Sequence, residues 1–165
     1  MRKNEKIEIL KRLSHAHVVH VIGTYTHMKV LGIIMYPVAI CDLYTFFEDV
    51  EAWTALVLQH PQSVALVYLD SSSKERLDAL EYDYPTNPSN GLMAIPIFVQ
   101  MGCLLSAVAY IHGQKIRHKD LNPFNILLTR NKIWISDFGS ATDFSLRSQS
   151  GTDNERGTPR YFAPE

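Results

Sequence analysis

Three side chains in the C-terminal part of the sequence have types and spacing suited to phosphate chemistry. Asp120 and Asn125 lie in the segment IRHKDLNPFNILL, and Asp137 follows the next run of β-branched and aromatic residues. Pro123 would interrupt a helix and would remove a ladder donor from a central strand, so this segment is predicted to be a loop. A loop that gathers an Asp, two Asn and a His is suited to chemistry.

The segments that flank this loop predict how the side chains come together. NILLT and KIWISD, with residues 130–131 at the turn, are typical of a small antiparallel hairpin. The hairpin would bring Asn125 and Asp137 to one end, where an amide oxygen and a carboxylate suit Mg²⁺ that keeps waters and binds phosphates. Asp120 is expected to face the same spot as a general base that orients a hydroxyl. Gly139 is expected to let the backbone turn sharply away.

The first third of the chain predicts a helix, a hairpin and a second helix. Residues 4–13 place apolar side chains at helical spacing, and the β-branched and aromatic runs 18–25 and 30–36 predict a hairpin. Asp42 is placed to cap the helix that follows it. The apolar residues of that helix are Leu43, Phe46, Phe47, Val50 and Trp53.

The middle of the chain gives a weaker pattern than the helix after it. Residues 59–90 mix a strand-like run, a charged helical stretch and a close rich in Pro, Asn and Ser, and a surface insertion is predicted near 59–94. A buried helix that ends near Gly113 should follow, because apolar residues recur three and four positions apart. These residues are Ile97, Met101, Leu104, Val108 and Ile111.

Composition excludes some classes of partner. The chain is 46% hydrophobic with a net charge of −1, which is typical of a globular protein and unlike the basic surfaces that bind nucleic acid or anionic membranes. No apolar run reaches the ~18 residues of a membrane helix, and the N-terminus lacks a signal-peptide core. Cys41 and Cys103 are therefore expected to be reduced thiols. We expect an intracellular protein, cytoplasmic or nuclear, with no nucleic-acid or membrane partner.

Several motifs, in their order along the chain, resemble those of the protein kinase family. The sequence HKDL at 118–121 followed by Asn125 is similar to the catalytic loop H-R-D-L-x-x-x-N, DFG at 137–139 matches D-F-G, and APE at 163–165 matches A-P-E. Residues 157–161 look like the peptide-binding segment of Ser/Thr kinases. The sequence is also similar to a divergent, fungal-like branch of the family.

The resemblance implies an α+β, protein-kinase-like bilobal fold, truncated at both ends. Residues 1–165 would be a partial kinase domain, with 1–40 as the remnant of the N-lobe and hinge and 41–165 as the C-lobe through A-P-E. No G-x-G-x-x-G and no V-A-I-K strand occur in the sequence, so the loop that covers the ATP phosphates and its companion Lys are missing from it.

The resemblance also implies roles in phosphoryl transfer that uses ATP and Mg²⁺. Asp120 would be the catalytic base, and Asn122 stands where Ser/Thr kinases have the Lys that supports the transferred phosphate. Asn125 and Asp137 would bind Mg²⁺ and, through it, the ATP phosphates. The nucleotide base and sugar would be met by the gatekeeper, the hinge and the start of the next helix, which are Met35, Tyr36, Pro37, Val38, Ala39 and Asp42.

Other family positions imply packing and regulation. His118 and Phe138 resemble residues that pack inside the kinase core, and the family position of Thr158 contacts the catalytic Asp. Lys119 replaces the usual Arg but keeps a cation that could pair with a phosphate. An upstream activating kinase would place that phosphate in the polar stretch before Pro159. The candidate acceptors are Ser145, Ser148, Ser150 and Thr152.

Three functions are compatible with these residues. The first is ATP-dependent phosphorylation of Ser/Thr hydroxyls on a protein substrate. The second is a pseudokinase or interaction module, favoured by Asn122 and by the missing phosphate-covering loop. The third is a metal phosphoesterase that uses Asp120 and Asp137, which would need neither a hinge nor an A-P-E segment. The isolated chain is expected to be inactive.

Overall fold

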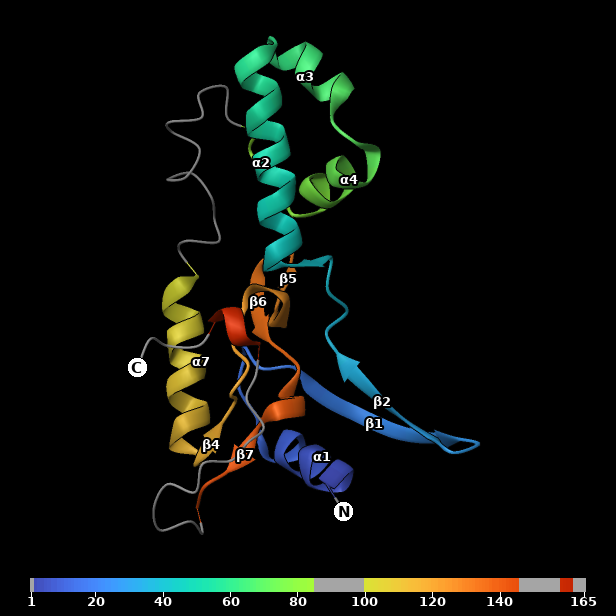
Figure 1. The fold of residues 1–165 in the computed structure, drawn as a ribbon, viewed down its shortest axis with the longest axis vertical. Helices are drawn as coiled ribbons and strands as arrows, with labels where there is room; N and C mark the ends of the chain where they lie inside the picture. The colour runs from blue at the N-terminus through green and yellow to red at the C-terminus, as the bar shows by residue number, and fades with distance from the viewer. Residues whose placement is uncertain (1, 85–99, 146–157, 162–165) are drawn as a thin grey trace.

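The computed structural model describes residues 2–84, 100–145 and 158–161, and it combines helices with short antiparallel sheets (Figure 1). The α-helices are α1 (Arg2–Arg12), α2 (Leu43–Gln59), α3 (Gln62–Tyr68), α4 (Ser71–Ala79) and α7 (Met101–Gly113). The short 3₁₀ helices are η1 (Pro123–Asn125), η2 (Phe138–Ser140) and η3 (Pro159–Tyr161). Among the described residues, no helix has the length and apolar character needed to cross a membrane.

Three small sheets connect these helices. The strands are β1 (His20–His27), β2 (Val30–Tyr36), β3 (Cys41–Asp42), β4 (Ile116–Arg117), β5 (Ile126–Thr129), β6 (Lys132–Ile135) and β7 (Thr142–Asp143). β1 pairs with β2, β5 lies between β3 and β6, and β4 pairs with β7, all antiparallel. The α+β fold class expected from the sequence is therefore confirmed.

The N-terminal segment is hydrogen-bonded to β6, the strand that precedes the candidate site. Leu10 and Leu13 of the first helical region are buried, as their spacing predicted. Val18 is fully buried and forms a parallel bridge with Ile135 of β6. The backbone N–H of Val19 also donates to the carbonyl of Ile135 at 3.0 Å. These contacts fix the end of β6, two residues before Asp137.

The β1–β2 hairpin extends away from the rest of the molecule (Figure 1). Its predicted turn forms at Met28 and Lys29, and Tyr25 faces Gly32 across the pair. A Cβ at Gly32 would lie 2.3 Å from the Tyr25 ring, so glycine leaves room for that ring. Many of the hairpin's large apolar side chains are exposed: Ile22, Tyr25, Met28, Val30, Ile33, Ile34, Met35 and Tyr36.

α2 begins where the sequence predicted. The side chain of Asp42 accepts a hydrogen bond from the backbone N–H of Thr45 at 2.8 Å, which satisfies a donor at the helix N-terminus. Phe46 and Trp53 are buried against the core, whereas the predicted apolar residue Phe47 is 39% exposed. α2 therefore buries one face in the core and exposes the ring of Phe47 on another face.

The first part of the predicted surface insertion near 59–94 is helical and packs on the core. Residues 62–79 form α3 and α4, both packed on α2, and Ala65 and Leu77 are fully buried. Arg76 of α4 donates two hydrogen bonds of 2.7 Å to Asp49, which is 3% exposed. This segment is therefore part of the core, while residues 85–99 lie outside the described structure.

α7 and the β5–β6 hairpin also contribute buried residues to the core. α7 ends at Gly113, as predicted, and buries Ala107 and Ile111, whereas Ile97 of the predicted helix lies outside the described residues. β5 and β6 pair with Ile126 opposite Ile135, which confirms the second predicted hairpin. Its end carries the candidate site.

Candidate active site

The loop that carries Asp120 is anchored by a buried histidine. His118 is 3% exposed, its Nε2 lies 2.8 Å from the carbonyl oxygen of Ser136, and its ring stands edge-on to Phe138 with centroids 4.6 Å apart. Burial lowers the pKa of His118, so the neutral imidazole is favoured. His118 and Phe138 therefore pack, as predicted, and tie the loop to the segment that holds Asp137.

Asn122 shapes the loop from within. Its Oδ1 accepts a hydrogen bond of 3.0 Å from the backbone N–H of Phe124 at the start of η1, and Pro123 occupies the first helical position, where no donor is needed. Its Nδ2 donates to the backbone carbonyl of Asp120 at 3.1 Å and to its Oδ1 at 3.0 Å. Asn122 is 6% exposed, so its neutral amide is a buried structural element of the loop.

The carboxylate of Asp120 is the centre of a hydrogen-bond network. Its Oδ1 accepts from the backbone N–H of Thr158 at 2.7 Å and from the Thr158 hydroxyl at 2.8 Å. Asn122 and Asn125 add bonds from their Nδ2 atoms at 3.0 and 3.3 Å. Burial raises the pKa of Asp120, but the bonds from Thr158, Asn122 and Asn125 lower it by more, so it lies below its usual value. Asp120 is therefore held as a charged acceptor.

Asn125 pairs with Ser136, the residue before Asp137, at the end of the β5–β6 hairpin. The backbone N–H and the hydroxyl of Ser136 donate to the carbonyl oxygen of Asn125 at 2.9 and 3.1 Å. This pairing places Asp137 directly beyond the bonded pair, as the sequence predicted. Sequence reasoning had missed Ser136, although a serine that ends the apolar run KIWI is a recognisable signal for such a bond.

The sharp turn after β6 falls on Asp137 and not on Gly139. Asp137 has φ 54° and ψ 71°, in the left-handed region, whereas no glycine among the described residues has positive φ. The N–H of Gly139 donates to Asp137 Oδ1 at 3.0 Å, and a Cβ at Gly139 would lie 2.8 Å from that oxygen. Glycine is therefore suited to this position because it leaves room for the Asp137 carboxylate.

The donor set of Asn125 and Asp137 fits a hydrated divalent cation. Asp137 is exposed, and the Asn125 nitrogen faces Asp120, which leaves the amide oxygen for an ion. Across the described ranges, no group of three or more His, Cys, Asp or Glu side chains could hold a metal. An ion bound here would take its other ligands from water and phosphate, as Mg²⁺ does at phosphate-transfer sites.

The predicted hinge, residues 36–39, follows the predicted gatekeeper Met35 and leads from the end of β2 to β3. The Tyr36 ring stands edge-on to Trp134 of β6, with centroids 6.3 Å apart. Just after the hinge, the N–H of Ile40 donates to the carbonyl of Leu128 in β5 at 2.8 Å. The hinge is thereby fastened to the sheet that carries the site. The exposed apolar side chains of the predicted gatekeeper and hinge are Met35, Tyr36 and Val38.

Asp42, predicted to reach the ribose, has a local partner in the structure. Oδ1 accepts from the Thr45 N–H, and the Thr45 hydroxyl donates to Oδ2 at 3.2 Å. Both oxygens therefore serve the α2 cap, and a ribose contact stays a prediction.

Two predicted features fall wholly or partly outside the described residues. Ser148, Ser150 and Thr152 are among the proposed phosphate acceptors, and they are not described, nor is the A-P-E segment at 163–165. Ser145 is described, and its backbone N–H donates to Asp143 at 2.8 Å.

Comparison with known proteins identifies the family and agrees with the fold. The chain belongs to the protein kinase family, because the family described as "Protein kinase domain" matches residues 2–165. It is 30% identical over 125 residues to serine/threonine-protein kinase PrkC of Bacillus subtilis, covering 70% of this chain and 19% of that protein.

Two further relatives are similar to this chain over different extents. The Saccharomyces cerevisiae protein named "Probable serine/threonine-protein kinase FMP48" is 31% identical over 143 residues, covering 86% of this chain and 35% of that protein. Serine/threonine-protein kinase fused of Drosophila melanogaster is 43% identical over 65 residues, covering 39% of this chain and 8% of that protein. The chain thus spans about a third or less of the length of these relatives.

Proposed function

We propose that the protein transfers the terminal phosphoryl group of ATP to Ser or Thr hydroxyls of protein substrates. The observation that carries this proposal is the geometry at Asp120, where a charged carboxylate already accepts a hydrogen bond from the Thr158 hydroxyl at 2.8 Å. A substrate hydroxyl requires an acceptor of the same kind, with about 2.6–3.2 Å between the hydroxyl oxygen and the carboxylate oxygen. The serine/threonine kinases among the relatives also support this substrate class.

The residues of the site suggest a division of work. Asp120 would accept the proton of the substrate hydroxyl. At the same time the hydroxyl oxygen would bond to the terminal phosphorus of ATP, and the bond between that phosphorus and ADP would break. Asn122 and Asn125 hold Asp120 in place through their amide nitrogens. Asn125 and Asp137 would hold Mg²⁺, which when bound neutralises charge on the phosphate oxygens.

A second candidate, a pseudokinase or interaction module, is favoured by one feature. Asn122 brings a neutral amide to the position where the family has a Lys, so no cation there supports the transferred phosphate. Both candidates keep the hydrogen bonds around Asp120. They differ in whether Mg²⁺ and ATP bind productively.

Titration of the full-length protein with ATP, with and without Mg²⁺, separates the two candidates. A kinase should bind ATP more tightly with Mg²⁺, and Asp137→Asn should weaken this binding at least about tenfold because a charged ligand is lost. The matched control is Asp83→Asn, an exposed carboxylate just beyond α4. Binding that is absent, or unaffected by both Mg²⁺ and Asp137→Asn, would favour the interaction module.

A further inference from the structure

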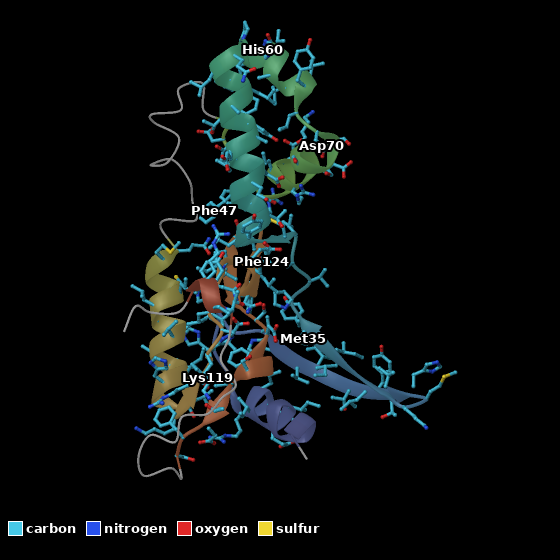
Figure 2. The ribbon with its side chains drawn as sticks, in the orientation of Figure 1. Met35, Phe47, His60, Asp70, Lys119 and Phe124 are labelled. Carbon is cyan, nitrogen blue, oxygen red and sulfur yellow. The ribbon has the colours of Figure 1, made fainter. Side chains whose placement is uncertain are left out.

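An aromatic stack lies on the loop that carries Asp120. The rings of Tyr44 and Phe124 stack with centroids 4.2 Å apart and planes 25° from parallel. Phe124 is 48% exposed, Phe47 39% and Tyr161 37%. Figure 2 shows Phe124 and Phe47 near the base of α2. Tyr44, Phe47, Phe124 and Tyr161 are called the aromatic patch.

Charges around Tyr44 show that η3 lies near it. The pKa of Tyr44 is raised, first by its hydrogen bond to Glu48 and then by the charge of that residue. Arg160 of η3 lowers this pKa and Tyr161 of η3 raises it, so these two residues lie within electrostatic range of the Tyr44 hydroxyl. Tyr44 of α2 therefore contacts η1 through Phe124 and lies within electrostatic range of η3.

Hydrogen bonds connect both sides of the patch to Asp120. On one side, Asn122 caps η1 at Phe124 and donates to Asp120. On the other, the Tyr161 N–H donates to the carbonyl of Thr158 at 3.0 Å, and Thr158 donates twice to Asp120. Phe124 follows Asp120 by four residues, which limits their separation to about 13 Å. An extended peptide spans that distance with about four residues.

The chemistry of the patch favours an apolar side chain over a basic one. Stacked rings present apolar faces, and covering them releases water from a large aromatic surface. The carboxylate beside the patch, Glu48, is already bonded to Tyr44, and Arg160 would repel a substrate Lys or Arg. A large aliphatic or aromatic side chain fits this surface.

We propose that the aromatic patch selects protein substrates that carry a bulky apolar residue within about four positions of the Ser or Thr acceptor. This inference rests on the proposed phosphoryl transfer. The reason is the position of the patch along the peptide path. A peptide whose hydroxyl reaches Asp120 must pass over the segments that are hydrogen-bonded to Asp120, and Phe124 and Tyr161 lie on those segments.

The test uses the full-length protein and peptides with one Ser acceptor. Peptides that carry Leu at a single position within four residues of that Ser are compared with the same peptide carrying Ala or Lys. Placing one Leu on the patch should raise kcat/KM about tenfold over Ala at one or more positions. Phe124→Ala and Tyr44→Ala should lower this Leu-to-Ala ratio at least about fivefold, while Phe124→Leu should retain most of it.

Tyr68→Ala is the matched control, because Tyr68 is a 64% exposed aromatic residue on α3. It should leave the Leu-to-Ala ratio unchanged. Equal kcat/KM for the Leu, Ala and Lys peptides would overturn this inference while leaving phosphoryl transfer intact. Transfer to none of the peptides would instead overturn the proposed function. A dimer that Phe124→Ala abolishes, without any peptide preference, would assign the patch to a second copy and also overturn the inference.

Discussion

Replacement of Arg76 by Ala should destabilise the helical body formed by α2, α3 and α4. The guanidinium is bidentate to Asp49, with both hydrogen bonds at 2.7 Å. The Asp49 side chain is 4% exposed, so the variant would leave a buried carboxylate without its partner. Breaking a buried pair in this way typically costs about 3–5 kcal/mol.

Urea unfolding followed by Trp53 fluorescence measures this loss, because Trp53 is 1% exposed on α2. With a urea dependence of about 2 kcal/mol per M, the transition midpoint should fall by roughly 2 M. If the starting stability is smaller than the loss, Arg76→Ala should show no cooperative transition. The double variant Asp49→Leu with Arg76→Met should then recover it, because an apolar pair removes the buried charge.

Arg130→Ala is the matched control for the same truncation at the surface. Arg130 pairs with Glu81, and their side chains are 64% and 55% exposed, so the loss should be about 0–1 kcal/mol. Equal destabilisation by Arg76→Ala and Arg130→Ala, within about 0.5 kcal/mol, would refute the conclusion that α4 and its ion pair belong to the core.

Three further predictions concern pH, modification and the isolated chain. Hydrogen bonds from Ser145, followed by Arg12, lower the pKa of Asp143 to about 2. The stabilisation that the ionised Asp143 carboxylate gives the folded state should therefore be complete above about pH 4 and lost as the pH falls toward 2. The melting-temperature difference between wild type and Asp143→Asn should shrink accordingly, and a constant difference would contradict this. Mass spectrometry of active full-length protein should find phosphate within residues 145–152, and an unmodified segment would remove that proposal. Residues 1–165 alone should transfer no phosphate, because their sequence holds no Gly-rich loop. Light scattering should show that they associate, because β1 and β2 expose large apolar side chains, and a monomer active toward a Ser/Thr peptide would contradict both expectations.

Local patterns were enough to predict the elements that carry the candidate site. The hairpin of β5 and β6 follows from two short apolar runs and a polar turn, and its geometry predicted that Asn125 and Asp137 meet at one end. The α2 N-terminus follows from Asp42, whose side-chain oxygen can satisfy a helix donor. These features depend on residues close together in the sequence.

Features set by distant contacts could not be predicted in the same way. The run SVALVY has strand-like composition, yet it forms α3 because packing on α2 buries Ala65. The Arg76 pair with Asp49 and the Tyr44 stack on Phe124 join residues far apart in the chain. The positive φ falls on Asp137 although Gly139, the residue type that this conformation favours most, lies two positions later.

The most direct measurement of the central claim is phosphate transfer from ATP to a Ser/Thr peptide by the full-length protein and its Asp120→Asn variant. The amide keeps the size of the side chain but cannot accept the substrate proton, so kcat should fall at least about a hundredfold. ATP affinity should stay nearly unchanged, because Asp120 acts on the acceptor hydroxyl, and Asp83→Asn should behave as wild type. Transfer by Asp120→Asn at the wild-type rate would contradict the role of Asp120 and the mechanism built on it.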